Sequence, residues 1–115
     1  MKADTGRFQD GGPNMRERDV EVLLKRETEK LGCLCMKFVS PGTAGVPDRI
    51  VLVPGGTAFF VELKAPGKTE RPLQRYVQER LRGQGFAVFS SVDSRERVMD
   101  VCEYIRDLRE KASKA

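Results

Sequence analysis

The sequence predicts an α/β domain in which one mixed β-sheet is flanked by helices. Three segments repeat their apolar residues with the period of a helix, and four shorter apolar segments have the composition of strands. Turns rich in Gly and Pro separate most of these segments. The resulting order is α-β-β-β-α-β-α, and a chain of 115 residues is long enough for one compact domain.

The expected elements follow one another without an internal repeat. They are a helix at 16–31, strands at 34–39, 49–53 and 58–64, a helix at 70–82, a strand at 86–90 and a last helix that opens at 93–96. Residues 1–14 are polar, Gly-rich and aperiodic, so we expect a flexible tail before a single domain at 15–115.

Local signals support each element. The first helix is expected because Val20, Leu23 and Leu24 fall on one face and Gly32 ends the pattern. The strand at 34–39 leads into a loop of turn-forming residues. A Pro-Gly-Gly turn separates the next two strands and favours a hairpin.

The second half of the chain alternates helix, strand and helix. Thr69 is expected to cap the second helix, whose buried stripe would contain Leu73, Val77 and Leu81. A short apolar strand follows. The spacing of acidic residues at 93 and 96 is typical of a capping box for the last helix. That helix has an apolar face made of Val98, Val101, Cys102, Ile105 and Leu108.

The chain contains no histidine, which excludes Ser-His-Asp and Cys-His nucleophiles, a histidine general base and the HExxH zinc site. Catalysis would therefore use carboxylates, lysines or backbone groups, with a metal that prefers oxygen ligands. Three cysteines are too few for a disulfide framework and indicate a reducing compartment, the cytoplasm. Cys33 and Cys35 are interpreted as core side chains, with a three-thiolate zinc site as the alternative. No apolar run is long enough to span a membrane.

The net charge of +4 is concentrated in one segment. Between residues 64 and 82 there are six basic and two acidic residues, whereas the two kinds are equal in number over 1–14, 15–63 and 83–115. A basic helix of this kind is typical of a protein that binds a polyanion, and a solvated helix surface is the alternative. Tyr76 is the only aromatic residue of that helix, so stacking of bases is not indicated.

A charged pair interrupts the most apolar of the expected strands. Alternation places Glu62 and Lys64 on the same face as Phe60, at the C-terminal end of the strand. If the hairpin pairs as expected, Asp48 lies near them. Two carboxylates at one point repel each other unless a cation joins them, and oxygen ligands suit Mg²⁺ or Mn²⁺. The alternative is a solvated salt bridge on an exposed strand face.

A longer pattern surrounds this pair. A Gly-Val-Pro-Asp motif that ends at Asp48 is followed after thirteen residues by Glu62-Leu63-Lys64, and then by Gln74 in the next helix. Over about residues 16–108 the sequence resembles the VRR-NUC (viral replication and repair nuclease) domain of the PD-(D/E)xK restriction-endonuclease-like superfamily. The resemblance implies a restriction-endonuclease-like fold and a metal-dependent DNA nuclease that acts on branched or flapped repair intermediates, including four-way, Holliday-like junctions. Stand-alone phage and bacterial members are implied to be homodimers.

The resemblance also implies roles for individual residues. Asp48 and Glu62 match the metal-binding carboxylates, and the backbone carbonyl of Leu63 matches a further metal ligand. Lys64 matches the catalytic lysine, and Gln74 matches the glutamine of the helix that follows the catalytic strand.

The family's site includes a glutamate from the first helix. Glu21 is our assignment because it precedes the Val-Leu-Leu run at the family's spacing, and Glu17, one turn earlier, is the other candidate. Many members carry a serine ahead of the glutamine, where this chain has an Arg-Pro-Leu stretch at 71–73.

We therefore expect a Mg²⁺- or Mn²⁺-dependent endonuclease that hydrolyses DNA phosphodiesters, with Lys68, Arg71 and Arg75 on the phosphate backbone. A homodimer is expected because a small basic domain has too little surface to span a junction alone. Two other classes stay open. One is a non-catalytic nucleic-acid-binding module of a larger repair assembly, and the other is a protein-interaction domain with a salt-bridged strand face.

Overall fold

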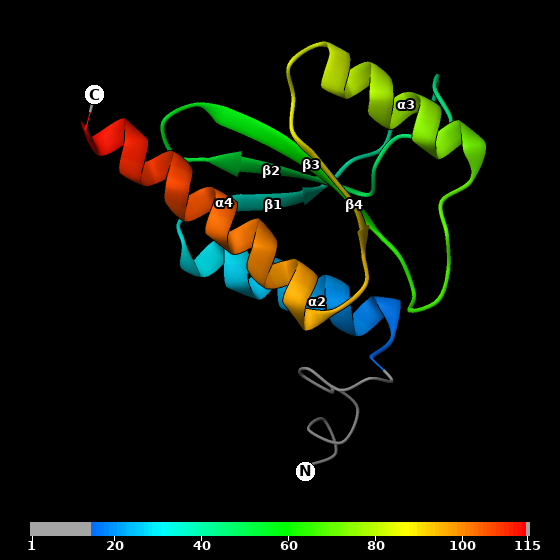
Figure 1. Cartoon of the computed structure of the whole chain (residues 1–115), viewed down its shortest axis with the longest axis horizontal. Coiled ribbons are helices and arrows are strands. Elements are labelled where there is room, and N and C mark those ends of the chain that lie inside the picture. The colour runs from blue at the N-terminus through cyan, green and yellow to red at the C-terminus, as the bar shows by residue number, and fades with distance from the viewer. Residues whose placement is uncertain (1–14, 115) are drawn as a thin grey trace.

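The computed structural model describes residues 15–114 and contains the predicted order of elements (Figure 1). The elements are α2 (Glu17–Lys30), β1 (Leu34–Lys37), β2 (Arg49–Val53), β3 (Thr57–Leu63), α3 (Pro72–Gly83), β4 (Val88–Val92) and α4 (Arg95–Lys114). The predicted α/β class, with one mixed sheet flanked by helices, is confirmed. The tail expected at 1–14 lies outside the described residues.

The sheet has the strand order β1-β2-β3-β4. Strand β2 pairs antiparallel with both β1 and β3, whereas β4 pairs with β3 in parallel. The predicted hairpin is confirmed, with Arg49 opposite Val61 and Val53 opposite Thr57. Because the hairpin turn is at the far end, the residue that precedes β2 lies beside the C-terminal end of β3.

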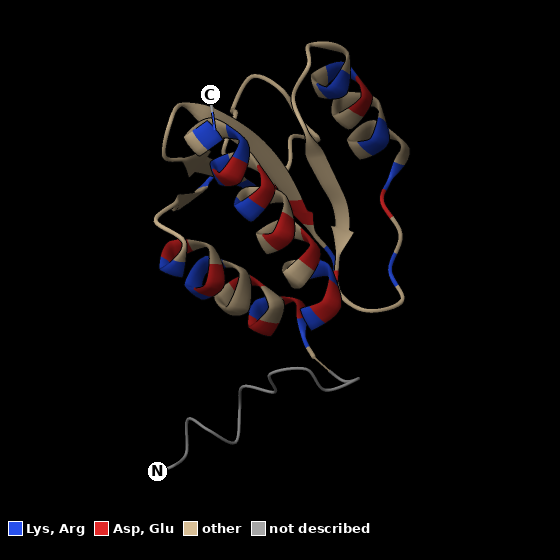
Figure 2. Cartoon of the chain, turned by 60° about the vertical axis from the view of Figure 1, so that its left-hand side comes forward, with Lys and Arg blue, Asp and Glu red and all other residues tan. Residues whose placement is uncertain are grey.

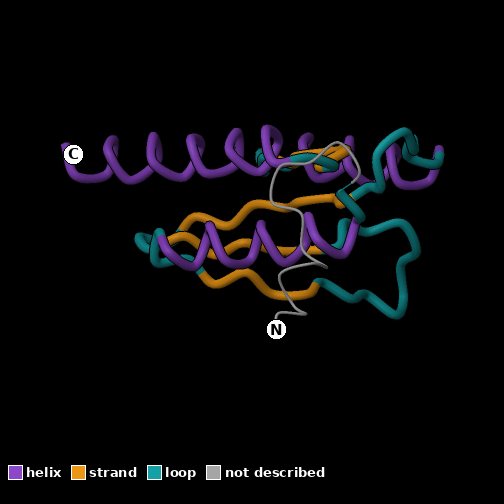
Figure 3. Tube along the Cα trace, turned by 90° about the horizontal axis from the view of Figure 1, so that it is seen from below, coloured by secondary structure: helices purple, strands orange, loops and turns teal. Residues whose placement is uncertain are grey.

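Helices lie on both faces of the sheet. Figure 3 shows α2 lying over the strands and α4 running alongside it, and Figure 1 shows α3 on the opposite side. The main core lies under α2 and α4, where Phe59 is fully buried and meets Tyr104 edge-on at a centroid distance of 5.1 Å. The neighbouring Phe60 points to the other face and contacts the rings of Phe38 and Phe86.

The start of α3 differs from the prediction. The helix begins at Pro72, with Arg71 rather than Thr69 at the N-cap position, because proline is preorganised for the first helical turn, where no N–H is needed. The face of this helix that packs on the sheet contains Gln74, Val77 and Gln78, whereas Leu73 is 49% exposed. The prediction that Leu73 is buried was therefore wrong.

Two other boundaries shift towards the C-terminus. Strand β4 begins at Val88 rather than Phe86, because the N–H of Phe86 donates to the carbonyl of Leu81 (3.2 Å) in the turn that leaves α3. Helix α4 is capped by Ser94 rather than Asp93. The Ser94 Oγ accepts the N–H of Arg97 at 3.2 Å.

All three cysteines are buried and free, which confirms that Cys33 and Cys35 are core residues. Burial raises the pKa of each thiol. Among residues 15–114, no helix combines the length and the apolar character that crossing a bilayer requires.

Candidate active site

The candidate site lies where β3 ends and its pairing with β4 is irregular. Val61 pairs with Phe89 and Leu63 pairs with Val92, so β4 contains one more residue than β3 over this stretch. This is a β-bulge directly beside Glu62, and Ser91 within it has a φ of +52°. The carboxylate of Glu70 accepts the N–H of Ser91 at 2.7 Å and holds the bulge in place.

Asp48 lies beside the end of β3, as the hairpin predicted. Its Oδ2 accepts the backbone N–H of Leu63 at 2.8 Å. Burial raises the pKa of Asp48, while the Leu63 N–H and the charge of Lys64 oppose that rise. The side chain is thus fixed by one oxygen next to the charged end of the strand.

Glu62, Lys64 and Gln74 form a hydrogen-bonded network between β3 and α3. Gln74 Nε2 donates to Glu62 Oε2 at 2.8 Å, and Gln74 Oε1 accepts from Lys64 Nζ at 2.9 Å. The Lys64 ammonium also lies 3.6 Å from Glu62 Oε2. Side-chain exposure is only 2% for Glu62 and 14% for Lys64, which rules out a solvated salt bridge on an exposed strand face.

The environment of Glu62 disfavours the ionised form of its carboxyl group. Burial and the nearby Asp48 raise the pKa of Glu62 from 4.5 to about 7, against the opposing charge of Lys64. Its second oxygen, Oε1, is buried and has no hydrogen-bond partner within the described part of the chain. An unpaired buried carboxylate oxygen facing carboxylate repulsion is what a bound cation would relieve.

Both candidate glutamates of α2 line a cavity of about 300 Å³ beside this network, together with Asp48 and Leu63. The structure therefore places Glu17, Glu21 and Asp48 around one space. Glu62 does not line that cavity. Over residues 15–114, no group of three or more His, Cys, Asp or Glu side chains is arranged to hold a metal ion.

Comparisons with known proteins identify the family of the chain. No family model matches the sequence. A protein of Acyrthosiphon pisum secondary endosymbiont phage 1, named "Putative nuclease p44", is 46% identical over 74 residues, which cover 64% of this chain and 80% of that protein. A solved structure described as a VRR_NUC domain is 34% identical with a TM-score of 0.70, covering 76% of this chain and 94% of that one. The chain belongs to the VRR-NUC family.

In this VRR-NUC domain, one charged residue near the site was not singled out from the sequence. Arg49 follows Asp48 directly, and its side chain is only 8% exposed and paired with Glu21. A signal was available, because strand alternation places Arg49 on the same inward face as the buried Val51 and Val53. A lone arginine at an inward strand position requires a partner.

The basic segment of the VRR-NUC domain lies on the surface next to the network. Lys68, Arg71 and Arg75 are all exposed, and Figure 2 shows basic residues along α3 and the segment that leads into it. The N–H of Arg71 donates to Gln74 Oε1 at 2.9 Å, so the basic segment is joined directly to the Glu62–Lys64 network.

Proposed function

We propose that this VRR-NUC protein is a metal-dependent endonuclease that hydrolyses phosphodiester bonds in branched DNA. The carrying observation is the buried network of Glu62, Lys64 and Gln74 next to Asp48. Membership of the VRR-NUC family and the nuclease name of the phage relative support the reaction class. The choice of flapped or four-way DNA follows from the family resemblance.

The chemistry of these donors suits a cation with oxygen ligands, although within residues 15–114 their present spacing does not form a ready-made metal site. Within residues 15–114, Glu62 Oε1 is buried without a partner, and the hydrogen bond that Asp48 accepts from the Leu63 N–H uses only its Oδ2. Asp48, Glu62, Glu21 and the carbonyl of Leu63 would hold Mg²⁺ or Mn²⁺. When bound, such an ion lowers the pKa of a water molecule and stabilises negative charge at phosphorus.

Lys64 would orient the attacking water and stabilise the charge that builds on the phosphoryl oxygens. An ammonium group has three N–H donors, and two acceptors of this network, Gln74 Oε1 and Glu62 Oε2, lie at 2.9 and 3.6 Å. A donor remains for substrate or water. As the water oxygen bonds to phosphorus, the ester P–O bond breaks, and a preorganised ammonium stabilises that step more than a mobile one would.

Gln74 would act as a positioning residue. Its amide joins both catalytic side chains, with one end on Lys64 and the other on Glu62. It therefore bridges the carboxylate and the ammonium. It also fixes the rotamer of each, which a flexible lysine alone does not do.

Lys68, Arg71 and Arg75 would bind the phosphate backbone. They are exposed beside the network, and their charge gives an affinity that falls steeply with salt as counterions are released. A homodimer would bring two such surfaces to one branched substrate. The direct test of the homodimer is light scattering of the full chain after size-exclusion chromatography. A monomer mass would contradict the homodimer.

The test of the function is cleavage of a labelled four-way junction, a flap and a linear duplex of the same sequence, with Mg²⁺, Mn²⁺ or EDTA. We expect metal-dependent cleavage that favours the branched DNAs and is lost in Asp48→Asn and Lys64→Ala. Asp107→Asn, an exposed carboxylate of α4, is the matched control and should cleave normally. Cleavage in EDTA or by Lys64→Ala would overturn the mechanism. Unchanged DNA binding without any cleavage would favour the non-catalytic module instead.

A further inference from the structure

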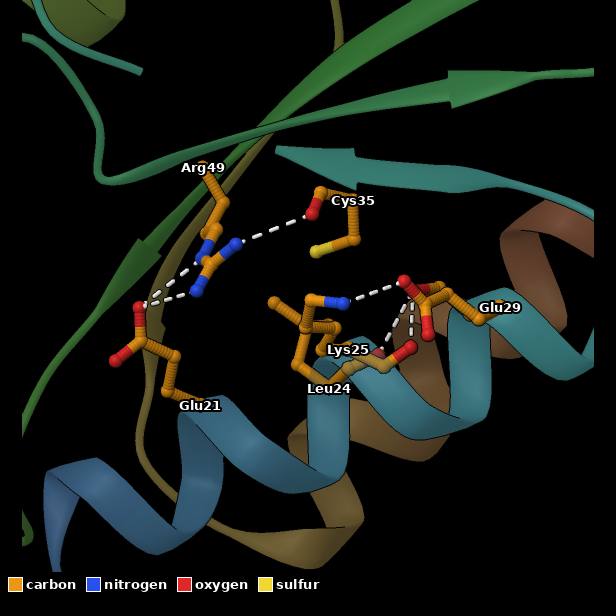
Figure 4. Close-up of polar contacts among 7 residues, drawn as sticks. Glu21, Leu24, Lys25, Glu29, Cys35 and Arg49 are labelled. Carbon is orange, nitrogen blue, oxygen red and sulfur yellow. Dashed lines mark hydrogen bonds and ion pairs between the residues drawn. The ribbon is translucent and has the colours of Figure 1, made fainter. Parts of the chain in front are cut away.

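Arg49 donates two hydrogen bonds to one oxygen of a carboxylate at the edge of the candidate site (Figure 4). Its Nε and one terminal nitrogen donate to Glu21 Oε2 at 3.0 and 2.8 Å. The other terminal nitrogen donates to the backbone carbonyl of Cys35 at 3.1 Å. The guanidinium is thus anchored to β1 and β2 and extends to α2.

The contact leaves half of the Glu21 carboxylate available. Both donated bonds go to Oε2, and among residues 15–114 no hydrogen bond reaches Oε1. Glu21 lines the cavity shared with Asp48 and Leu63, and its side chain is 28% exposed. Figure 4 shows its free oxygen pointing away from Arg49.

Glu17 lines the same cavity but is not held in this way. It is exposed, and no ion pair to it occurs within the described part of the chain. A glutamate fixed in one rotamer loses less conformational entropy when it binds a cation than a freely rotating one. The arginine therefore distinguishes two glutamates that sequence spacing left as alternatives.

We propose that Arg49 is a positioning residue that fixes Glu21, rather than Glu17, as the α2 ligand for the metal of the nuclease site. This inference rests on the proposed function. Arg49 would bind one carboxylate oxygen and leave the other for the cation, which is the usual role of a residue behind a metal ligand. Its planar guanidinium suits this task because both donors meet the carboxylate from a fixed direction.

Arg49 could affect metal binding in two opposite ways, and these predict changes of opposite sign when it is replaced. Arg49 is also a positive charge close to the site, and like charges repel a cation. If Arg49 only neutralised Glu21, its removal would tighten metal binding. If Arg49 positions Glu21, its removal weakens binding because the ligand becomes mobile. The sign of the change decides between the two.

The experiment measures Mn²⁺ affinity of the full chain without DNA, by isothermal titration calorimetry and by the electron paramagnetic resonance of unbound Mn²⁺. We expect about tenfold or more weaker binding in Arg49→Met and Arg49→Lys. The lysine variant keeps the charge but not the two fixed donors of the guanidinium. Lys25→Met is the matched control. It removes a cation from the exposed Lys25–Glu29 pair of α2, the helix that also contains Glu21. Lys25→Met and Glu17→Gln should stay within about twofold of the original protein.

A double-mutant cycle separates positioning from a general effect on the fold. In a Glu21→Gln background, Arg49→Met should weaken Mn²⁺ binding no further. Additive losses, or tighter or unchanged binding in folded Arg49 variants, would overturn the proposal. If Arg49→Met fails to fold by circular dichroism, Arg49→Lys decides the outcome. Mn²⁺ binding and DNA cleavage that survive in the Arg49 variants would sink only this inference, whereas an original protein that binds no Mn²⁺ would sink the proposed function with it.

Discussion

The raised pKa of Glu62 predicts that the metal-free protein loses stability as the pH rises. Burial and Asp48 raise the pKa of Glu62 to about 7 in the folded state, against 4.5 as its ordinary value. Between these two values the folded chain binds a proton that the unfolded chain has released. Stability falls with pH wherever the folded state binds more protons, so the loss extends from about pH 4.5 to about pH 7.

The size of the effect follows from the shift. Each pKa unit corresponds to about 1.4 kcal/mol, so a displacement from 4.5 to about 7 gives on the order of 3 kcal/mol. Exposure of 2% justifies using most of that figure, because solvent hardly screens the group. Asp48 adds a contribution of the same sign, since burial raises its pKa as well. Glu62→Gln removes the titration while keeping the shape of the side chain.

The assay is urea unfolding in EDTA at several pH values from 4 to 8, for the original chain and for Glu62→Gln. Relative to Glu62→Gln, the original chain should lose about 3 kcal/mol of free energy of unfolding as the pH rises. Saturating Mn²⁺ should reduce or reverse this trend, because a cation favours the ionised carboxylate. A difference that is constant with pH, or that moves in favour of the original chain in EDTA, would refute the account of Glu62.

Three further predictions concern neighbouring features. Gln74→Met should lower the free energy of unfolding by about 2–4 kcal/mol in urea, because Lys64 Nζ, Glu62 Oε2 and the Arg71 N–H all lose a partner; a loss below about 0.5 kcal/mol would show that the amide is dispensable. Replacing Lys68, Arg71 and Arg75 together by Gln should reduce the slope of log K against log salt for duplex DNA by about 3, whereas Lys111→Gln on α4 should leave it unchanged. Gly45→Ala should cost about 1–3 kcal/mol of thermal stability, because Gly45 has a φ of +88° and a new Cβ would lie 3.0 Å from the Cγ of Leu73; an unaltered melting temperature would contradict this.

The sequence was sufficient for the order of the elements and for the charged end of β3. Alternation placed Glu62 and Lys64 on one face, and the hairpin placed Asp48 beside them, because both rules depend only on neighbouring residues and a short turn. The boundaries of α3 and β4 were less predictable. They depend on Pro72 and on a backbone bond from Phe86 to Leu81, which compete with side-chain patterns of similar strength.

The contacts that hold the site came only from the structure. Arg49 and Glu21 are 28 positions apart in the sequence, and Ser91 and Glu70, which meet at the bulge, are 21 positions apart. No periodicity links such pairs, since their proximity depends on how α2 and β4 pack on the sheet. The sequence alone shows that Arg49 is at an inward-facing strand position. A buried arginine requires a partner, but the sequence does not identify that residue.

Gln74 explains how one small domain can join polyanion binding to a carboxylate–lysine site without a histidine. Its Oε1 accepts from both Lys64 Nζ and the Arg71 N–H, so the same atom fixes the Lys64 ammonium and the first turn of α3. The position of the basic segment and the geometry of the reactive pair are therefore set together. Displacement of the first turn of α3 would therefore disturb both the Arg71 backbone and the Lys64 side chain. Gln74 reaches that position because it lies in the first turn of α3, on the buried face of the helix.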